Sequence, residues 1–197
     1  MNLLYACSSN RGKLAEFALA AGASGLGAVQ ILPLPGLKEI APPPENGDTF
    51  EANAVFKAVF YSSFTREKVF ADDSGLEVAA LANAPGILSA RFAGPDATDE
   101  TNNTFLLEKL NGIPLRSARF VTVVALAQKG TLLATASGAV NGEILYAPRG
   151  DGGFGYDPLF FYPPLGRSFA ELQDAEKFAV SARGQALRKL LQDAFLR

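Results

Sequence analysis

The 197-residue chain contains no histidine and only one cysteine, Cys7. The lack of histidine excludes a Ser-His-Asp triad, a Cys-His pair and a histidine-bound zinc ion. The single cysteine excludes an intramolecular disulfide, which suits a reducing compartment. We expect Cys7 to be a small strand residue rather than a nucleophile. An enzyme of this composition would have to use carboxylates, lysines, hydroxyls and a hard cation such as Mg²⁺.

The chain also lacks a long apolar run and an excess of positive charge. No run reaches the length of a membrane span, and residues 1–7 have neither a positive leader nor a small-residue cleavage site. We therefore expect a cytoplasmic protein with no membrane partner. The formal net charge is −2 and the pI is about 5.3. Such a balance gives no basic field for a nucleic-acid polymer, although local lysines and arginines could hold a small anion.

The length and the pattern of elements predict an α/β fold. At 197 residues with 48% apolar composition, we expect a single domain, residues 1–197, with a sizeable core. Strands are predicted over residues 2–7 and 29–34, and helices over 14–21, 50–64 and from Thr98. The β-rich runs 119–129 and 132–145 predict a long antiparallel hairpin, which excludes a purely parallel sheet. A mixed sheet flanked by helices follows.

The acidic stretch at residues 69–75 is the first candidate for a functional site. Val69, Phe70 and Ala71 predict a short buried strand, and residues 72–75 (Asp, Asp, Ser, Gly) predict a turn at its carboxyl end. Open α/β sheets bind ligands at such ends. Two adjacent carboxylates repel each other, so they stay solvated or share a cation. The alternative is an ordinary Asp-rich turn that bonds nearby backbone amides.

Two further polar segments precede predicted helices. Residues 8–13 (Ser, Ser, Asn, Arg, Gly, Lys) lie between a strand and a helix, where free backbone amides and Lys13 could bind an anion. The alternative is simple capping by Ser9 or Asn10, with Lys13 in solvent. Glu45 stands just before the second helix, which Asp48 or Thr49 could cap. From there its carboxylate could reach a neighbouring site or remain solvated.

The carboxyl-terminal half adds a glycine-rich loop and a capped helix. Four glycines between residues 148 and 157 permit close backbone approach to a ligand, and Phe154 and Tyr156 offer faces on which a base could stack. The alternative is a flexible hairpin loop with Phe154 in the core. Ser181 is a good helix N-cap, which would place Arg183 in the first turn. A cation there opposes the helix dipole, so we expect an anionic partner for Arg183.

Five segments occur in the order seen in the inosine triphosphate pyrophosphatase family, which this chain closely resembles over about residues 3–190. They are residues 8–13, 70–76, 84–94, 152–161 and 176–187. The resemblance implies hydrolysis of ITP, dITP and XTP to the monophosphate and pyrophosphate. It also implies an elongated mixed β-sheet flanked by helices, two lobes with a central cleft, a Mg²⁺ cofactor and a homodimer.

The resemblance also implies roles for individual residues. Asp73 matches the general base, and the acidic positions around Mg²⁺ match Glu45, Asp72 and Asp73. The implied substrate-binding residues are Ser8, Ser9, Asn10, Arg11, Gly12, Lys13, Ser74, Phe154, Gly155, Tyr156, Asp157, Lys177, Ala182 and Arg183.

One position departs from the family pattern. Ala182 stands where the family has a histidine that helps to read the purine, and a methyl group can neither donate nor accept a hydrogen bond. We therefore expect a triphosphate hydrolase with reduced or altered base selectivity. Two alternatives stay open: a nucleotide-binding or sensing protein that has lost turnover, and a pyrophosphatase of the related septum-inhibitor type that acts on pyrimidine or modified nucleotides. A purely structural protein would not need these acidic, glycine-rich and basic loops together.

Overall fold

The computed structural model describes residues 2–23 and 29–195. Its seven strands form one sheet in the order β2-β1-β3-β4-β5-β6-β7. The strands are β1 (Asn2–Ala6), β2 (Val29–Pro33), β3 (Lys68–Val78), β4 (Ser117–Gln128), β5 (Thr131–Ile144), β6 (Phe160–Tyr162) and β7 (Arg167–Ser168). Strand β1 is parallel to both β2 and β3, and the remaining pairs are antiparallel. The predicted mixed sheet and its long hairpin are therefore confirmed.

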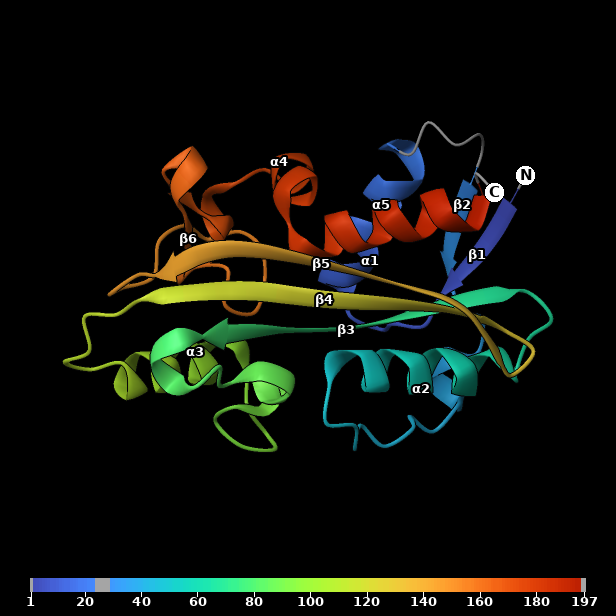
Figure 1. Ribbon diagram of the computed structural model, residues 1–197, viewed down its shortest axis with the longest axis horizontal. Helices are drawn as coiled ribbons and strands as arrows, with labels where there is room; N and C mark the ends of the chain where they lie inside the picture. Colours follow the sequence, from blue (N-terminus) through green and yellow to red (C-terminus); the bar gives the residue numbers. More distant parts are fainter. Residues whose placement is uncertain (1, 24–28, 196–197) are drawn as a thin grey trace.

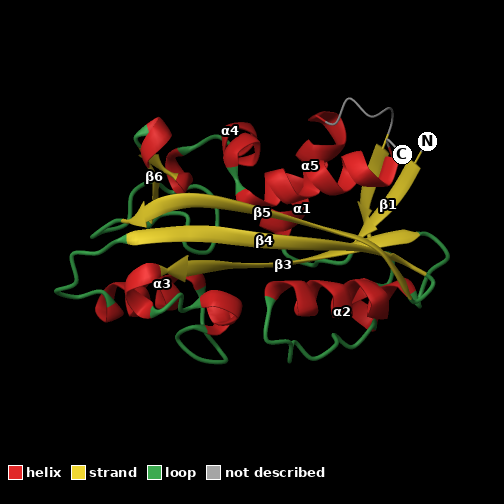
Figure 2. Cartoon of the chain, in the orientation of Figure 1, coloured by secondary structure: helices red, strands yellow, loops and turns green. Residues whose placement is uncertain are grey.

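Helices cover both faces of this elongated sheet (Figures 1 and 2). They are α1 (Arg11–Ala23), α2 (Phe50–Ser62), α3 (Asp99–Lys109), α4 (Asp174–Val180) and α5 (Ala182–Phe195). Helices α2 and α3 lie on one side of the long strands, and α1, α4 and α5 lie on the other. None of the helices in the described ranges is long and apolar enough to cross a membrane.

The helix starts follow the predicted caps. Thr49 caps α2 by accepting a hydrogen bond from the Ala52 amide, and Thr98 caps α3 by accepting one from the Thr101 amide. Ser181 accepts a hydrogen bond from the Gly184 amide at the start of α5. Further along α5, Arg188 donates to the carbonyls of Phe178 and Ala179 and so satisfies acceptors at the end of α4.

Strand β3 corrects the predicted turn at residues 72–75. The strand continues without interruption from Lys68 to Val78, and the acidic pair lies in its middle. Residues 69–78 all pair with β4, which holds the chain extended through the polar stretch. On its other side β3 pairs with β1 only at residues 68–70. The acidic pair therefore lies where β1 ends beside β3, rather than at the end of β3 itself.

One of the two main core clusters lies between the sheet and helices α1 and α5. Phe70 on β3 is fully buried, and its ring meets Phe17 of α1 edge-to-face with 4.9 Å between centroids. Leu4, Leu187 and Leu190 belong to the same cluster. This packing fixes α1 against the first half of β3 and so positions the loop that precedes α1.

We predict that Phe70→Ala lowers the free energy of unfolding by about 3–5 kcal/mol, because it leaves a cavity between β3 and α1. Urea unfolding would measure this loss. The matched control is Phe56→Ala, since the Phe56 side chain is 48% exposed on α2 and its removal should change the free energy by only about 0.5 kcal/mol. Equal effects of the two substitutions would contradict this description of the core.

Candidate active site

Two adjoining pockets lie beside the middle of β3. We call the first the aromatic pocket, which is lined by residues from β3, β4, the glycine-rich loop and the start of α5. Its lining includes Ser74, Leu76, Ser89, Phe120, Thr122, Phe154, Gly155, Tyr156, Asp157, Phe169, Lys177, Ala182 and Arg183. We call the second the charged pocket, and its charged lining residues are Lys13, Lys38, Glu45, Lys57, Asp72 and Arg91. Asn10 and Lys13 line both pockets.

The N-terminal end of α1 and the residue before it join the two pockets. Asn10 caps the helix, because its side-chain oxygen accepts a hydrogen bond from the Lys13 amide at 3.0 Å. Ser8 in turn accepts one from the Asn10 amide at 3.2 Å. The predicted capping alternative is therefore correct for Asn10. Lys13, however, does not stand in solvent, since its ammonium lies 2.9 Å from the Asp72 carboxylate.

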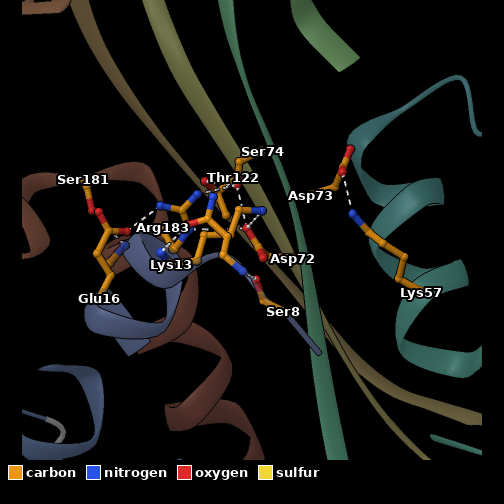
Figure 3. A network of polar contacts seen from close by, with 12 residues as sticks. Ser8, Lys13, Glu16, Lys57, Asp72, Asp73, Ser74, Thr122, Ser181 and Arg183 are labelled. Atoms are coloured by element: carbon orange, nitrogen blue, oxygen red, sulfur yellow. Dashed lines mark hydrogen bonds and ion pairs between the residues drawn. The ribbon is translucent and has the colours of Figure 1, made fainter. Parts of the chain in front are cut away.

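Asp72 and Asp73 direct their side chains to opposite faces of the sheet, as neighbouring strand residues must. Asp72 lies on the side of α1 and α5, where it is bound by Lys13 and by Arg183 at 3.3 Å. Asp73 lies on the side of α2, 2.8 Å from the Lys57 ammonium (Figure 3). The expected mutual repulsion of the two carboxylates is therefore relieved by separate cations on the two faces.

Helix α2 supplies the partners of Asp73. Lys57 bridges Asp73 and Glu45, with 2.8 Å to each carboxylate. Asn53, one helical turn earlier, donates to Asp73 at 3.3 Å and accepts from the Gly47 amide at 2.9 Å. Burial raises the pKa of Asp73 above its ordinary value, and Lys57 offsets this only in part. Burial alone would raise the pKa of Glu45, but Lys57, together with Lys13 and Arg91, outweighs it and lowers that pKa.

A buried ion network lies between α1, α4 and α5. Glu16 is 4% exposed, and its carboxylate lies 3.0 Å from Lys177 and 2.5 Å from Arg183. Lys177 also binds Asp157, and Arg183 also binds Asp72. Arg183 therefore has the anionic partners that its place in the first turn of α5 predicted. The two cations hold the pKa of Glu16 below its ordinary value despite burial.

The glycine-rich loop places the Phe154 ring against the first turn of α1. Asp157 shapes it by accepting a hydrogen bond from the Phe154 amide at 2.8 Å. The ring lies so close to Gly12 that a Cβ there would come within 2.4 Å of it, so only glycine fits. The Lys177 ammonium lies over the ring, 4.3 Å from its centroid. Tyr156 is buried and donates to the Ser89 carbonyl, so Phe154 is better placed to stack on a base.

The structure brings most of the predicted site residues together. Those that line one of the two pockets, or both, are Ser8, Ser9, Asn10, Lys13, Glu45, Asp72, Ser74, Phe154, Gly155, Tyr156, Asp157, Lys177, Ala182 and Arg183. Asp73 adjoins them through Lys57, and Gly12 through Phe154. Arg11 is exposed and lines neither pocket.

Sequence reasoning missed Glu16, Asn53 and Lys57. Each lies in a helix whose apolar spacing predicts packing against the core and does not by itself mark a polar site residue. The available signal was spacing, because Asn53 and Lys57 are four residues apart and share one face of α2, and Glu16 follows Lys13 by three.

Cys7 is half-buried, and burial raises the pKa of its thiol to about 12. It would thus hold its proton at neutral pH, as expected for a residue without a nucleophilic role.

The carboxylates offer a partial set of metal ligands. Within the described ranges no three acidic, cysteine or histidine residues are grouped closely enough to form a metal site by themselves. Glu45 and Asp73 nevertheless converge on Lys57, whereas Asp72 is held by Lys13 and Arg183. Magnesium commonly uses one or two carboxylates together with water and substrate phosphates. Glu45 and Asp73 alone therefore fit a magnesium site better than the predicted set of Glu45, Asp72 and Asp73.

The chain is similar to known proteins over nearly its whole length. The sequence profile of the Ham1 family matches residues 4–193. A dITP/XTP pyrophosphatase of Acidobacterium capsulatum is 49% identical over 197 residues, covering 95% of this chain and 96% of that protein. One from Exiguobacterium sp. is 48% identical, covering 96% and 95%. A solved structure of a HAM1 protein from Coxiella burnetii has a TM-score of 0.87 and 38% identity, covering 100% of both chains.

We predict that Glu16→Gln lowers the free energy of unfolding at pH 7 by about 3–5 kcal/mol, because it leaves Lys177 and Arg183 short of a buried counter-charge. A carboxylate with a lowered pKa stabilises the fold above its unfolded value near 4.5 and loses this effect as pH falls below it. The difference between wild type and variant should therefore shrink below about pH 4.5.

Urea unfolding at a series of pH values would measure this difference, with Glu67→Gln as the control because Glu67 is exposed. A difference that stays constant from pH 7 to pH 3 would show that Glu16 does not act through its charge.

Proposed function

Because the chain belongs to the Ham1 family, we propose that it hydrolyses deaminated purine nucleoside triphosphates to the monophosphate and pyrophosphate. The observation that carries the proposal is the junction of the two pockets at Asn10 and Lys13. A nucleotide laid across this junction would have its base beside Phe154 and its phosphates among the lysines.

The charged pocket suits a phosphate chain. Transfer of a phosphoryl group depends on neutralised charge and a positioned nucleophile rather than on covalent catalysis. Lys13 and Lys57 would each donate a further ammonium hydrogen to a phosphate oxygen while they keep the carboxylates that they now bind. Ser8, Ser9 and the first amides of α1 would add hydrogen-bond donors at the positive end of the helix dipole.

Asp73 is the residue we propose as general base. Its raised pKa makes it a better proton acceptor than an ordinary aspartate, and Asn53 and Lys57 fix its orientation. We propose that Glu45 and Asp73 hold Mg²⁺ when substrate is bound. The ion would neutralise phosphate charge and lower the pKa of an attacking water. Asp72 would keep Lys13 and Arg183 in place on the opposite face of β3.

The aromatic pocket would receive the purine. Phe154 supplies a ring for stacking, and Ser74, Thr122 and the backbone near Ala182 supply polar groups. Ala182 is 2% exposed and lines the pocket, so its methyl group leaves one edge of the base without a side-chain partner. We propose that the protein retains a preference for deaminated purines and that this preference is weaker than a histidine at position 182 would give. We also propose that the protein is cytoplasmic and forms a homodimer, on the basis of the family alone.

The proposed function predicts that pyrophosphate is released from ITP faster than from GTP or ATP, and only with Mg²⁺.

The proposed function also predicts that Ala182→His raises kcat/KM for ITP relative to kcat/KM for GTP by about fivefold to tenfold. This is the effect of one added hydrogen bond of about 1 kcal/mol. Measurement of pyrophosphate release by both proteins tests this. Equal rates for all three nucleotides would overturn the base preference, and binding of ITP without release would favour a sensor.

A second prediction concerns Asp73. Asp73→Asn should lower kcat by about 100-fold or more, because the amide cannot accept the proton. The pH dependence of kcat/KM reports the free enzyme, so kcat/KM of the wild type should fall at acid pH as Asp73 becomes protonated, at a pH above the ordinary aspartate value of 3.8. Lys57→Met removes the nearest cation, so the acid limb should move to still higher pH. The control is Asp96→Asn, an exposed aspartate outside both pockets. A variant Asp73→Asn with normal kcat would remove Asp73 from this role.

A further inference from the structure

Arg91 is a cation of the charged pocket to which neither the predicted roles nor the proposed mechanism gives a function. It ends the six-residue 3-10 helix η3 (Gly86–Arg91), which follows β3 in the chain. Its side chain is 38% exposed and lines the charged pocket with Lys13, Lys38 and Lys57. One guanidinium nitrogen, Nη1, lies 3.5 Å from the Glu45 carboxylate.

Buried hydrogen bonds hold the backbone of Arg91 in a fixed place. Asn102 of α3 is 4% exposed, and its side chain accepts from the Ala93 amide at 2.9 Å and donates to the Ala90 carbonyl at 3.2 Å. Arg91 lies between these two contacts. Ser89, two residues earlier, accepts from the Leu76 amide of β3 at 2.9 Å. The base of the side chain is thus tied to the same strand that carries Asp73.

The charged pocket has an excess of positive charge. Lys13, Lys38, Lys57 and Arg91 line it, whereas the acidic lining residues are Glu45 and Asp72. Cations still outnumber carboxylates when Asp73 is added. An arginine fork matches two oxygens of a phosphate group, and such charge-assisted hydrogen bonds are among the strongest in proteins.

The contact between Arg91 and Glu45 is easily exchanged. Both side chains are 38% exposed, and the 3.5 Å separation is longer than a charge-assisted hydrogen bond. Exposed pairs of this kind contribute at most about 1 kcal/mol. A phosphate group that enters the pocket could therefore replace Glu45 as the partner of Arg91, while Glu45 keeps Lys57.

We propose that Arg91 binds the phosphate chain of the nucleotide at the end remote from the base. Lys13 lines both pockets and so marks the part of the chain nearest the nucleoside, whereas Arg91 lines the charged pocket and not the aromatic one. Arg91 would then help the protein to distinguish a triphosphate from a monophosphate. This inference rests on the proposed function, because it assigns the phosphates of that substrate to the charged pocket.

Binding of inorganic tripolyphosphate without metal tests the inference directly, since this probe has phosphates and no base. By calorimetry, Arg91→Gln should weaken tripolyphosphate binding by about tenfold, the loss of one charge-assisted contact. Arg91→Lys should lose less, because it keeps the charge without the fork. Binding of IMP should change by less than about twofold. The control is Arg66→Gln, which removes an exposed arginine outside both pockets.

Activity gives a second measurement that separates the two proposals. Arg91→Gln should raise KM for ITP more than it lowers kcat. The role of Arg91 would be overturned if Arg91→Gln bound tripolyphosphate as tightly as the wild type, or if it lost affinity for tripolyphosphate and IMP equally. In that case hydrolysis of ITP by the wild type would still support the proposed function. Failure of the wild type to bind tripolyphosphate would overturn the assignment of the charged pocket to phosphate and Arg91 with it. Failure of the wild type to hydrolyse ITP, with tripolyphosphate binding intact, would overturn the proposed function alone.

Discussion

The site depends on one constraint: two adjacent carboxylates lie in the middle of a strand that has helices on both faces. Asp72 and Asp73 face opposite sides of β3, so each needs its own source of positive charge. Helix α2 brings Lys57 to one side, and α1 and α5 bring Lys13 and Arg183 to the other. Three helices are thus tied to one short stretch of strand by charge as well as by apolar packing.

The same ion pairs prepare the protein for an anionic ligand. Lys13 and Lys57 stand in the pocket as partners of carboxylates, so their side chains are already ordered before substrate arrives. A bound phosphate chain would then meet lysines that are already ordered, which lowers the entropic cost of binding. Glu16 keeps Lys177 and Arg183 oriented in the neighbouring aromatic pocket in the same manner.

Much of the fold could be predicted from the sequence, because periodicity and caps are local, whereas the predicted roles of the site residues rest on the resemblance to a known family. Thr49 and Thr98 cap helices where their neighbours indicate, and the hairpin at Gly130 follows from two long β-rich runs. The course of β3 could not be predicted. Its polar residues resemble a turn, and only pairing with β4 keeps them extended. The roles of Lys57 and Glu16 likewise depend on helices meeting a distant strand.

The contact between Gly12 and the Phe154 ring joins the two ends of the site through sterics alone. A larger residue at position 12 would displace the ring, and a smaller side chain at position 154 would leave a gap beside the helix. The two positions are therefore sterically coupled, so a change in the ring that holds a base would also alter the packing of the first turn of α1.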